Sequence, residues 1–305
     1  MSQQITTAFV EQYRNNVELL VQQRGSVLRD FVNVDNAIVG KTKFTEQIGS
    51  TEAQKKVSRH SDSPLVNTPH ARRAYSLEDY EWGDLIDKND KVRMLIDPTS
   101  SYAQAAAFAM GRAMDDVIID AATGTAKTGV SGGTNTDLPS TQVILKNDAD
   151  KGSPGSHGLS PQKLRAAMTI FHENSVPEDE EKFLVVSPKA IQSLLTHKEV
   201  VSSDFNTVRA LVNGEVDTYM GFRFIISNRL NVTSNVRDCF AYVRSGLELG
   251  IGQDVMARIE ERPDKSFSTY VYYCMTIGAT RLEEEKVVKI EVDEAAIGSG
   301  VAATV

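Results

Sequence analysis

The chain has 305 residues, of which 41% are hydrophobic, 7% aromatic and 24% charged, with 33 Lys and Arg against 41 Asp and Glu. These values exclude a disordered or fibrous chain and predict either two compact units or one unit with long extensions. The net charge of −8 excludes tight electrostatic wrapping of nucleic acid by the whole surface.

Neither secretion nor membrane insertion is expected from the sequence. The N-terminal residues lack a basic stretch ahead of an apolar one, and no run approaches the ~18 apolar residues of a membrane span. The two cysteines, Cys239 and Cys274, each lie in an apolar, strand-like stretch. This placement predicts buried, reduced thiols and no disulfide framework or zinc site.

The first expected element is an amphipathic helix that ends near Gly25. Its apolar side chains recur at helical spacing on one face and would need a partner surface: Ile5, Phe9, Tyr13, Val17, Leu20 and Val21.

Residues 24–73 hold nine Lys or Arg against five acids, a local balance of +4 in an acidic chain. The pattern is polar and poor in apolar residues, which predicts a long β-hairpin or an extended loop. Exposed loops beyond ~12–15 residues are uncommon in compact monomers, so this segment indicates assembly with other copies. We expect it to dock on an acidic surface of another copy, with a solvated loop as the simpler alternative.

A long helix is predicted over residues 98–123, with Asp97 as N-cap and Pro98 at the first helical position. Its alanines and Gly111 would let other elements approach closely, as in a central spine. The following Gly- and Ser-rich passage, up to residue 158, predicts a linker and domain boundary with one short strand over Gln142–Leu145.

Beyond the linker the pattern alternates between helices and strands. Helices are expected to start at Pro161, after the N-cap Ser160, and at Pro188, after Ser187. The last segment alternates cleanly, with Val288, Ile290 and Val292 on one face. Five further strands are expected: Lys182–Val186, Phe222–Ile226, Phe240–Arg244, Val255–Glu260 and Thr269–Ile277.

No catalytic, cofactor or metal site is predicted. Gly124–Gly129 has the glycine spacing of a phosphate loop, but Val130 stands where the lysine is needed. Residues 148–152 resemble a calcium loop whose glycine comes one place early. The five histidines form no zinc motif, and Asp115-Asp116 with Arg112 indicates a helix-surface or intersubunit ion pair.

The order of these elements resembles the major capsid proteins of tailed bacteriophages with the Hong Kong 97-like fold. The stretches that carry the resemblance are FVEQYRNNVELLVQQRGSVLR, the segment from HSDSPLVNTPHARR to MDDVIIDAATG, and FLVVSPKAIQSLLTHKEVVSSDF followed by GFRFIISNRL. Together they cover most of the chain.

The resemblance implies an α+β fold with an N-terminal arm, an extended E-loop, a peripheral domain with a long spine helix, and an axial domain. On this chain the implied parts are an arm (1–28), an E-loop (29–75), a peripheral domain (76–150, with the spine helix at 98–123), an axial domain (151–264) and C-terminal strands that return to the peripheral domain (265–305).

The implied function is a structural capsid protein, not an enzyme, that self-assembles into hexamers and pentamers of an icosahedral head around double-stranded DNA. The implied partners are other copies, portal and scaffolding proteins, and packaged DNA held non-specifically, with decoration proteins left open and no membrane. Such a protein is assembled in the bacterial cytoplasm and ends in the virion. Two alternatives stay open: an encapsulin-like nanocompartment shell protein and, in another class, a phosphate-binding enzyme.

The candidate intersubunit residues lie in the basic loop and on the N-terminal helix: Arg59, Arg72, Arg73, Lys41, Lys43, Phe9 and Tyr13.

Overall fold

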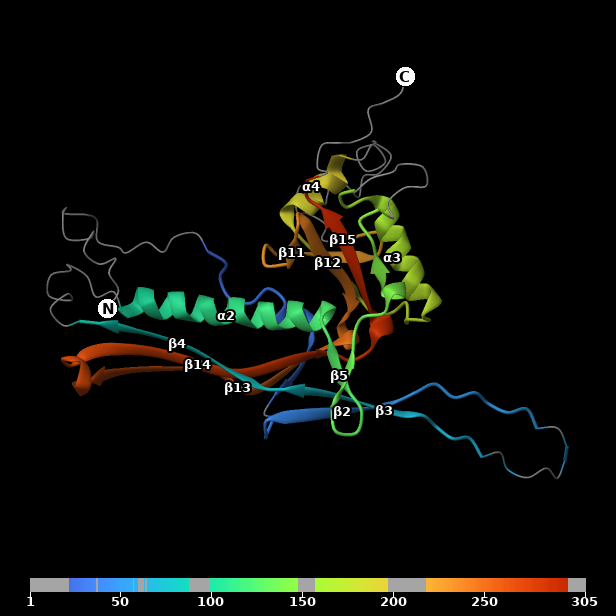
Figure 1. Cartoon of the computed structure of the whole chain (residues 1–305), viewed down its shortest axis with the longest axis horizontal. Coiled ribbons are helices and arrows are strands. Elements are labelled where there is room, and N and C mark those ends of the chain that lie inside the picture. The colour runs from blue at the N-terminus through green and yellow to red at the C-terminus, as the bar shows by residue number, and fades with distance from the viewer. Residues whose placement is uncertain are drawn as a thin grey trace, which may run out of the picture.

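The computed structural model describes residues 22–36, 38–56, 58–59, 63, 65–87, 99–147, 157–196 and 218–295. A long helix, α2 (Thr99–Thr123), lies along a sheet of long strands, and a second sheet stands at the C-terminal end of this helix (Figure 1). The described part contains no helix both long and apolar enough to cross a membrane.

The long sheet has the strand order β1-β13-β14-β4. Its strands are β1 (Asn33–Asn36), β13 (Leu247–Arg262), β14 (Ser268–Arg281) and β4 (Glu78–Ile86). Alternate side chains such as Met275 and Ile277 join the same core as Met110 and Met114 of α2, as the period of two in a strand requires. A sheet with one face under a helix therefore forms the base of the molecule.

The second sheet is seven-stranded, with the order β7-β15-β12-β8-β10-β9, and β11 pairs with β12. Its strands are β7 (Val143–Ile144), β15 (Val287–Asp293), β12 (Val236–Val243), β8 (Lys182–Val186), β10 (Phe222–Ile226), β9 (Thr218–Tyr219) and β11 (Val232–Thr233). All of β8 is buried and runs parallel to β10, which explains its unbroken apolar sequence.

Helices α3 (Pro161–Glu173) and α4 (Pro188–Thr196) pack on this second sheet and begin at the predicted caps. The Ser160 side chain accepts a hydrogen bond from the Lys163 backbone N–H, and Ser187 Oγ accepts one from the Ala190 N–H at 3.1 Å. Both caps satisfy backbone donors that the first turn of a helix leaves unpaired.

A third sheet forms from the predicted basic segment and the predicted linker. Its order is β2-β3-β5-β6, with β2 (Thr42–Ile48), β3 (His70–Ser76), β5 (Ala126–Thr128) and β6 (Thr134–Thr136). The expected hairpin is thus present, and the described part of the expected linker, residues 124–147, contains β5, β6 and the expected short strand, β7. Gly129 and Gly132 adopt positive φ and turn the chain, and β3 supplies the edge on which β5 pairs.

The sheet topology cuts across two of the segments expected from the sequence. β13 falls within the expected axial segment 151–264, yet it pairs with β14 in the long sheet. β15 was expected to return to the peripheral domain, but it pairs with β12 in the seven-stranded sheet. The chain crosses between the sheets through the short turns Arg244–Gly246 and Glu284–Lys286, and neither turn has a linker-like composition.

The remaining expectations have mixed outcomes. Strands β8 and β10 match their predicted limits, while β13 and β14 are longer than predicted. Cys239 is buried, but Cys274 is only half-buried, and both are free thiols. The N-terminal helix, the Asp97-Pro98 cap and the calcium-like loop lie outside the described residues.

Candidate functional site

The extended hairpin, defined here as residues 42–76, is the most prominent projection of the molecule. It leaves the body beneath the seven-stranded sheet, pointing away from the far end of the β13–β14 hairpin (Figure 1). Every described residue between 49 and 70 is exposed, including Leu65, which is 90% exposed. The described residues of the outer hairpin, defined here as residues 49–69, therefore bury almost nothing against their own subunit.

The base of the hairpin is anchored at a buried carboxylate, Glu248 of β13, which is only 4% exposed. Glu248 accepts hydrogen bonds from Lys43 Nζ and the Tyr75 hydroxyl, both at 3.0 Å, and from Thr45 Oγ1 at 3.2 Å. Burial and the adjacent Glu248 carboxylate raise the pKa of Tyr75, so this phenol remains a neutral donor. Lys43 also pairs with Asp35. Side chains from both strands thus converge on one charge.

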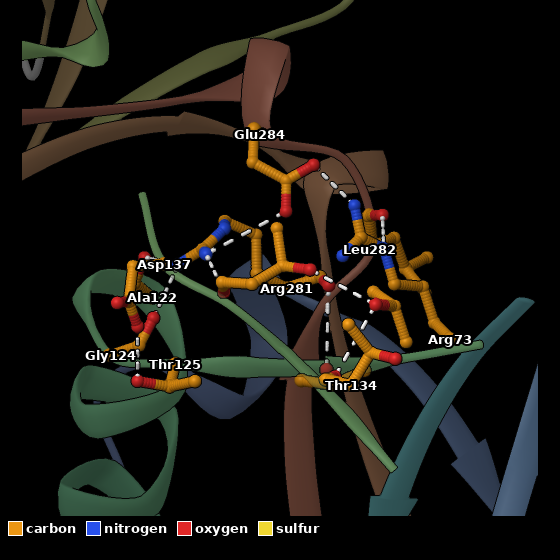
Figure 2. Close-up of polar contacts among 12 residues, drawn as sticks. Arg73, Ala122, Gly124, Thr125, Thr134, Asp137, Arg281, Leu282 and Glu284 are labelled. Carbon is orange, nitrogen blue, oxygen red and sulfur yellow. Dashed lines mark hydrogen bonds and ion pairs between the residues drawn. The ribbon is translucent and has the colours of Figure 1, made fainter. Parts of the chain in front are cut away.

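A second anchor lies where the chain crosses from β14 to β15. Gln47 Nε2 and Arg73 Nε both donate to the carbonyl oxygen of Leu282, each at 2.7 Å. Arg73 also forms an ion pair with Glu284, whose other carboxylate oxygen lies 3.7 Å from Arg281 Nη2 (Figure 2). One carboxylate therefore stands between two guanidinium groups.

Arg281 connects this anchor to the end of the spine helix. It is fully buried and donates to the carbonyl oxygens of Ala122 at 3.0 Å, Gly124 at 2.8 Å and Thr136 at 3.3 Å (Figure 2). A cation at a helix C-terminus satisfies carbonyls that the last turn leaves unpaired. Burial lowers the pKa of Arg281, and Glu284 opposes that shift. The Arg281 side chain thus contacts the end of α2, the β5–β6 hairpin and Glu284 of the crossover.

The β5–β6 hairpin supports the extended hairpin from the side. A Cβ atom on Gly132 would come within 2.7 Å of the Ala74 Cβ and within 3.4 Å of the Phe44 ring, so only glycine allows this approach. Arg72 lies over the Phe44 ring at 5.4 Å from its centroid and pairs with Glu46 at 2.5 Å. The inner part of the extended hairpin, strands β2 and β3, is therefore packed against its own subunit, and we call it the stem.

The spine helix also holds the N-terminal end of the described chain. The buried Asp115 carboxylate accepts hydrogen bonds from the backbone N–H groups of Val27 and Leu28, from Ser26 Oγ at 2.6 Å and from Gln23. Asp115 thus binds the N-terminal segment of its own subunit, whereas a helix-surface or intersubunit ion pair was expected from Asp115-Asp116 with Arg112. Arg112 instead donates to Gln22 and Gln23, and Asp116 pairs with Arg229.

The structure separates the candidate intersubunit residues into two groups. Lys43, Arg72 and Arg73 have acidic partners within their own chain. Arg73 is only 7% exposed, and its Nε and Nη2 atoms donate to Leu282 and Glu284 of the same chain. Lys41 and Arg59 are exposed. Phe9 and Tyr13 lie outside the described residues.

Lys43 and Arg73 of these anchors were singled out from the sequence, but their partners Glu248 and Glu284 were not. Glu248 and Glu284 stand in ordinary strand and turn patterns, and only Arg281, a charge at the end of an apolar strand, offered a signal. Gly124–Gly129 forms the first arm of the β5–β6 hairpin and its turn, not the strand-to-helix loop of a phosphate site. Within the described ranges no three His, Cys, Asp or Glu side chains cluster as metal ligands.

Comparison with known proteins identifies a family with this architecture. The model of the phage capsid protein family matches residues 5–294. A search of curated proteins found no match.

Three solved structures illustrate the similarity in fold. The capsid of Ralstonia phage GP4 is 10% identical, with a TM-score of 0.73 over 92% of this chain and 95% of that chain. The capsid of cyanophage P-SCSP1u is 15% identical, with a TM-score of 0.69 over 93% of both chains. The mature capsid of bacteriophage PhiM1 is 12% identical, with a TM-score of 0.65 over 92% and 91%. The expected Hong Kong 97-like capsid fold is confirmed.

Proposed function

The chain belongs to the phage capsid protein family, and from this premise we propose how it builds a shell. The protein is a structural capsid protein of a bacteriophage, and the comparisons do not favour the encapsulin-like alternative. Copies assemble as hexamers and pentamers into an icosahedral head that encloses double-stranded DNA. The extended hairpin acts as the E-loop of this assembly and lies on a neighbouring copy.

The exposure of the outer hairpin is the observation that supports this proposal most. Each of these exposed residues, if ordered without burial, would lose roughly 1–2 kcal/mol of backbone conformational entropy with little compensation. Exposed apolar side chains such as Ile48 and Leu65 gain stability only when another surface covers them. A second copy provides that surface in a repeating shell.

We assign the parts of the subunit from sheet pairing. The peripheral domain comprises α2 with the long sheet, and the axial domain comprises the seven-stranded sheet with α3 and α4. The arm keeps the limits expected from the sequence, residues 1–28. In this assignment β13 and β14 belong to the peripheral domain and β15 to the axial domain, which replaces the limits expected from the sequence.

The partners proposed for the shell are those of a DNA container. Portal and scaffolding proteins would serve assembly in the bacterial cytoplasm, and decoration proteins could bind the finished surface. The net charge of −8 fits DNA that is confined by a closed wall and not gripped by each subunit. We propose no enzymatic activity and no cofactor for the chain, since its family consists of structural proteins.

Removal of the outer hairpin tests the proposal. The Gly49 N–H donates to the Pro69 carbonyl oxygen at 2.8 Å, so residues 50–68 can be replaced by Asn-Gly, which favours a two-residue hairpin turn. The shortened protein should keep the circular dichroism spectrum and thermal unfolding of the full chain yet sediment only as monomers or small oligomers. Shells of normal size from this variant would refute the role of the hairpin.

A further inference from the structure

Strand β4 carries a concentrated negative charge. Residues 78–87 read EDYEWGDLID and contain five acids and no Lys or Arg. Glu78, Asp79 and Glu81 are exposed. Within the described ranges this strand is also the edge of the long sheet, because it pairs with β14 alone.

Among the described residues, the acids of β4 have hydrogen-bond donors but no cationic partners. Asp79 accepts from Thr276 Oγ1 at 2.6 Å, Glu81 from the Tyr272 hydroxyl at 2.8 Å, and Asp84 from the Leu85 backbone N–H at 2.8 Å. Within the described ranges no Lys or Arg forms an ion pair with any acid from Glu78 to Asp87. The negative charge of this edge is therefore not balanced within the described subunit.

The outer hairpin has a net charge of the opposite sign, +1, from three cations against two acids, Glu52 and Asp62. Lys55, Lys56 and Arg59 lie within five consecutive residues and are exposed. They form no ion pair with the acids of the described part of the chain, unlike Lys43, Arg72 and Arg73 in the stem. The charges left for another molecule thus lie at the outer end of the hairpin.

These two charged segments lie at opposite ends of the hairpin stem. In the register of β2 and β3, Ile48 pairs with His70 at the loop end, whereas Thr42 pairs with Ser76 beside the start of β4. Seven residues of strand separate the two ends by about 23 Å. From there β4 and the loop run in opposite directions (Figure 1), so a loop is directed away from β4 of its own subunit.

We propose that the acidic edge of β4 receives the basic outer hairpin of a second copy, through pairing of Lys55, Lys56 and Arg59 with Glu78, Asp79 and Glu81. This inference rests on the proposed shell function and names the two surfaces that meet. Because donor and acceptor surfaces lie at different ends of one subunit, the contact is head-to-tail and generates a ring when the rotation closes. Extended backbone in the loop can also pair with the open edge of β4.

A charge-swap experiment in the full chain tests the pairing. The edge variant carries Glu78→Lys and Glu81→Lys, and the loop variant carries Lys55→Glu and Lys56→Glu. The swapped variant combines all four substitutions and has the net charge of the unchanged chain. The control variant carries Glu178→Lys and Glu181→Lys, two exposed acids of the turn before β8, and changes net charge as the edge variant does. Circular dichroism checks the fold of each, and sedimentation with electron microscopy measures assembly.

We expect the edge and loop variants to reduce the assembled fraction at least tenfold, the swapped variant to restore it, and the control variant to assemble normally. Carbodiimide, which joins amines to carboxylates in direct contact, should link Lys55 or Lys56 to Glu78 or Glu81 between chains in particles mixed from isotope-labelled and unlabelled subunits. Normal assembly of the edge variant, or no rescue by the swapped variant, would overturn the inference while leaving the shell function intact. Failure of the unchanged chain to form shells would instead refute the proposed function.

Discussion

Glu284 offers the sharpest test of how the hairpin stem is held. Replacement of Glu284 by Gln keeps the size of the side chain but removes the carboxylate that lies between Arg73 and Arg281. Arg281 is fully buried and Arg73 nearly so, so neither guanidinium can gain much hydration in place of the lost charge. The two buried guanidinium groups would then have only neutral oxygen acceptors as partners, and no negative charge would lie between them.

The magnitude follows from the burial of these groups. Removal of one partner from a buried ion pair costs about 3–5 kcal/mol. Because Gln retains an oxygen acceptor and the carbonyls of Ala122 and Gly124 still bind Arg281, we expect about 3 kcal/mol. In a domain of some 150–250 residues, 1 kcal/mol lowers Tm by about 2–4 °C, so Tm should fall by roughly 6–12 °C.

Urea unfolding of dissociated subunits measures this loss, with circular dichroism and the fluorescence of the single tryptophan, Trp82, as probes. Glu46→Gln is the matched control, because it removes the carboxylate that pairs with Arg72 at the surface, where Glu46 is 71% exposed. Exposed pairs contribute ~0–1 kcal/mol. If Glu284→Gln changed stability no more than this control, the junction would not hold the stem as described.

Three further outcomes are expected. Gly111→Ala should lower Tm by several degrees, because a Cβ there meets the backbone of the N-terminal segment that crosses α2; unchanged thermal unfolding would show that the segment is held elsewhere. Cys239, whose pKa burial raises to about 12, should resist a maleimide reagent in native particles while the half-buried Cys274 reacts sooner, and equal labelling rates would contradict this. Burial tends to raise the pKa of Glu294, but hydrogen bonds from Arg237 and others lower it overall, so its stabilisation is present above its unfolded pKa of about 4.5 and is lost as the pH falls through the folded value. As the pH falls below about 4.5, the free energy of unfolding should therefore decrease less steeply for Arg237→Gln than for the unchanged chain. Equal slopes for the two proteins would argue against this linkage.

Local chemistry explains which elements the sequence predicted well. The starts of α3 and α4 follow from Ser-Pro caps that act within one helical turn. Strands β8 and β10 are short, apolar and buried, so their limits coincide with the change in composition. The hairpin of β2 and β3 followed from a polar, loosely alternating pattern together with a shortage of apolar residues.

Elements that depend on distant partners were not predictable in the same way. β5 and β6 have three residues each in a Gly-rich passage, and they become strands because β5 pairs with β3 and β6 pairs with β5. The long sheet pairs β4 with β14, whose partner residues, from Ile86 with Thr269 to Glu78 with Ile277, are 183 to 199 positions apart, so no local signal separates it from the seven-stranded sheet. Buried charges such as Glu248 and Arg281 resemble surface residues until the fold surrounds them.

The position of the outer hairpin in an assembled particle tests the account most directly. Electron cryo-microscopy of particles formed by the purified protein should show a closed shell in which residues 49–69 of each copy lie on a neighbouring copy, while the stem keeps its contacts with Glu248, Leu282 and Glu284. A folded protein that stays monomeric at all concentrations and salt conditions, or a shell in which the hairpin folds back onto its own subunit, would contradict it.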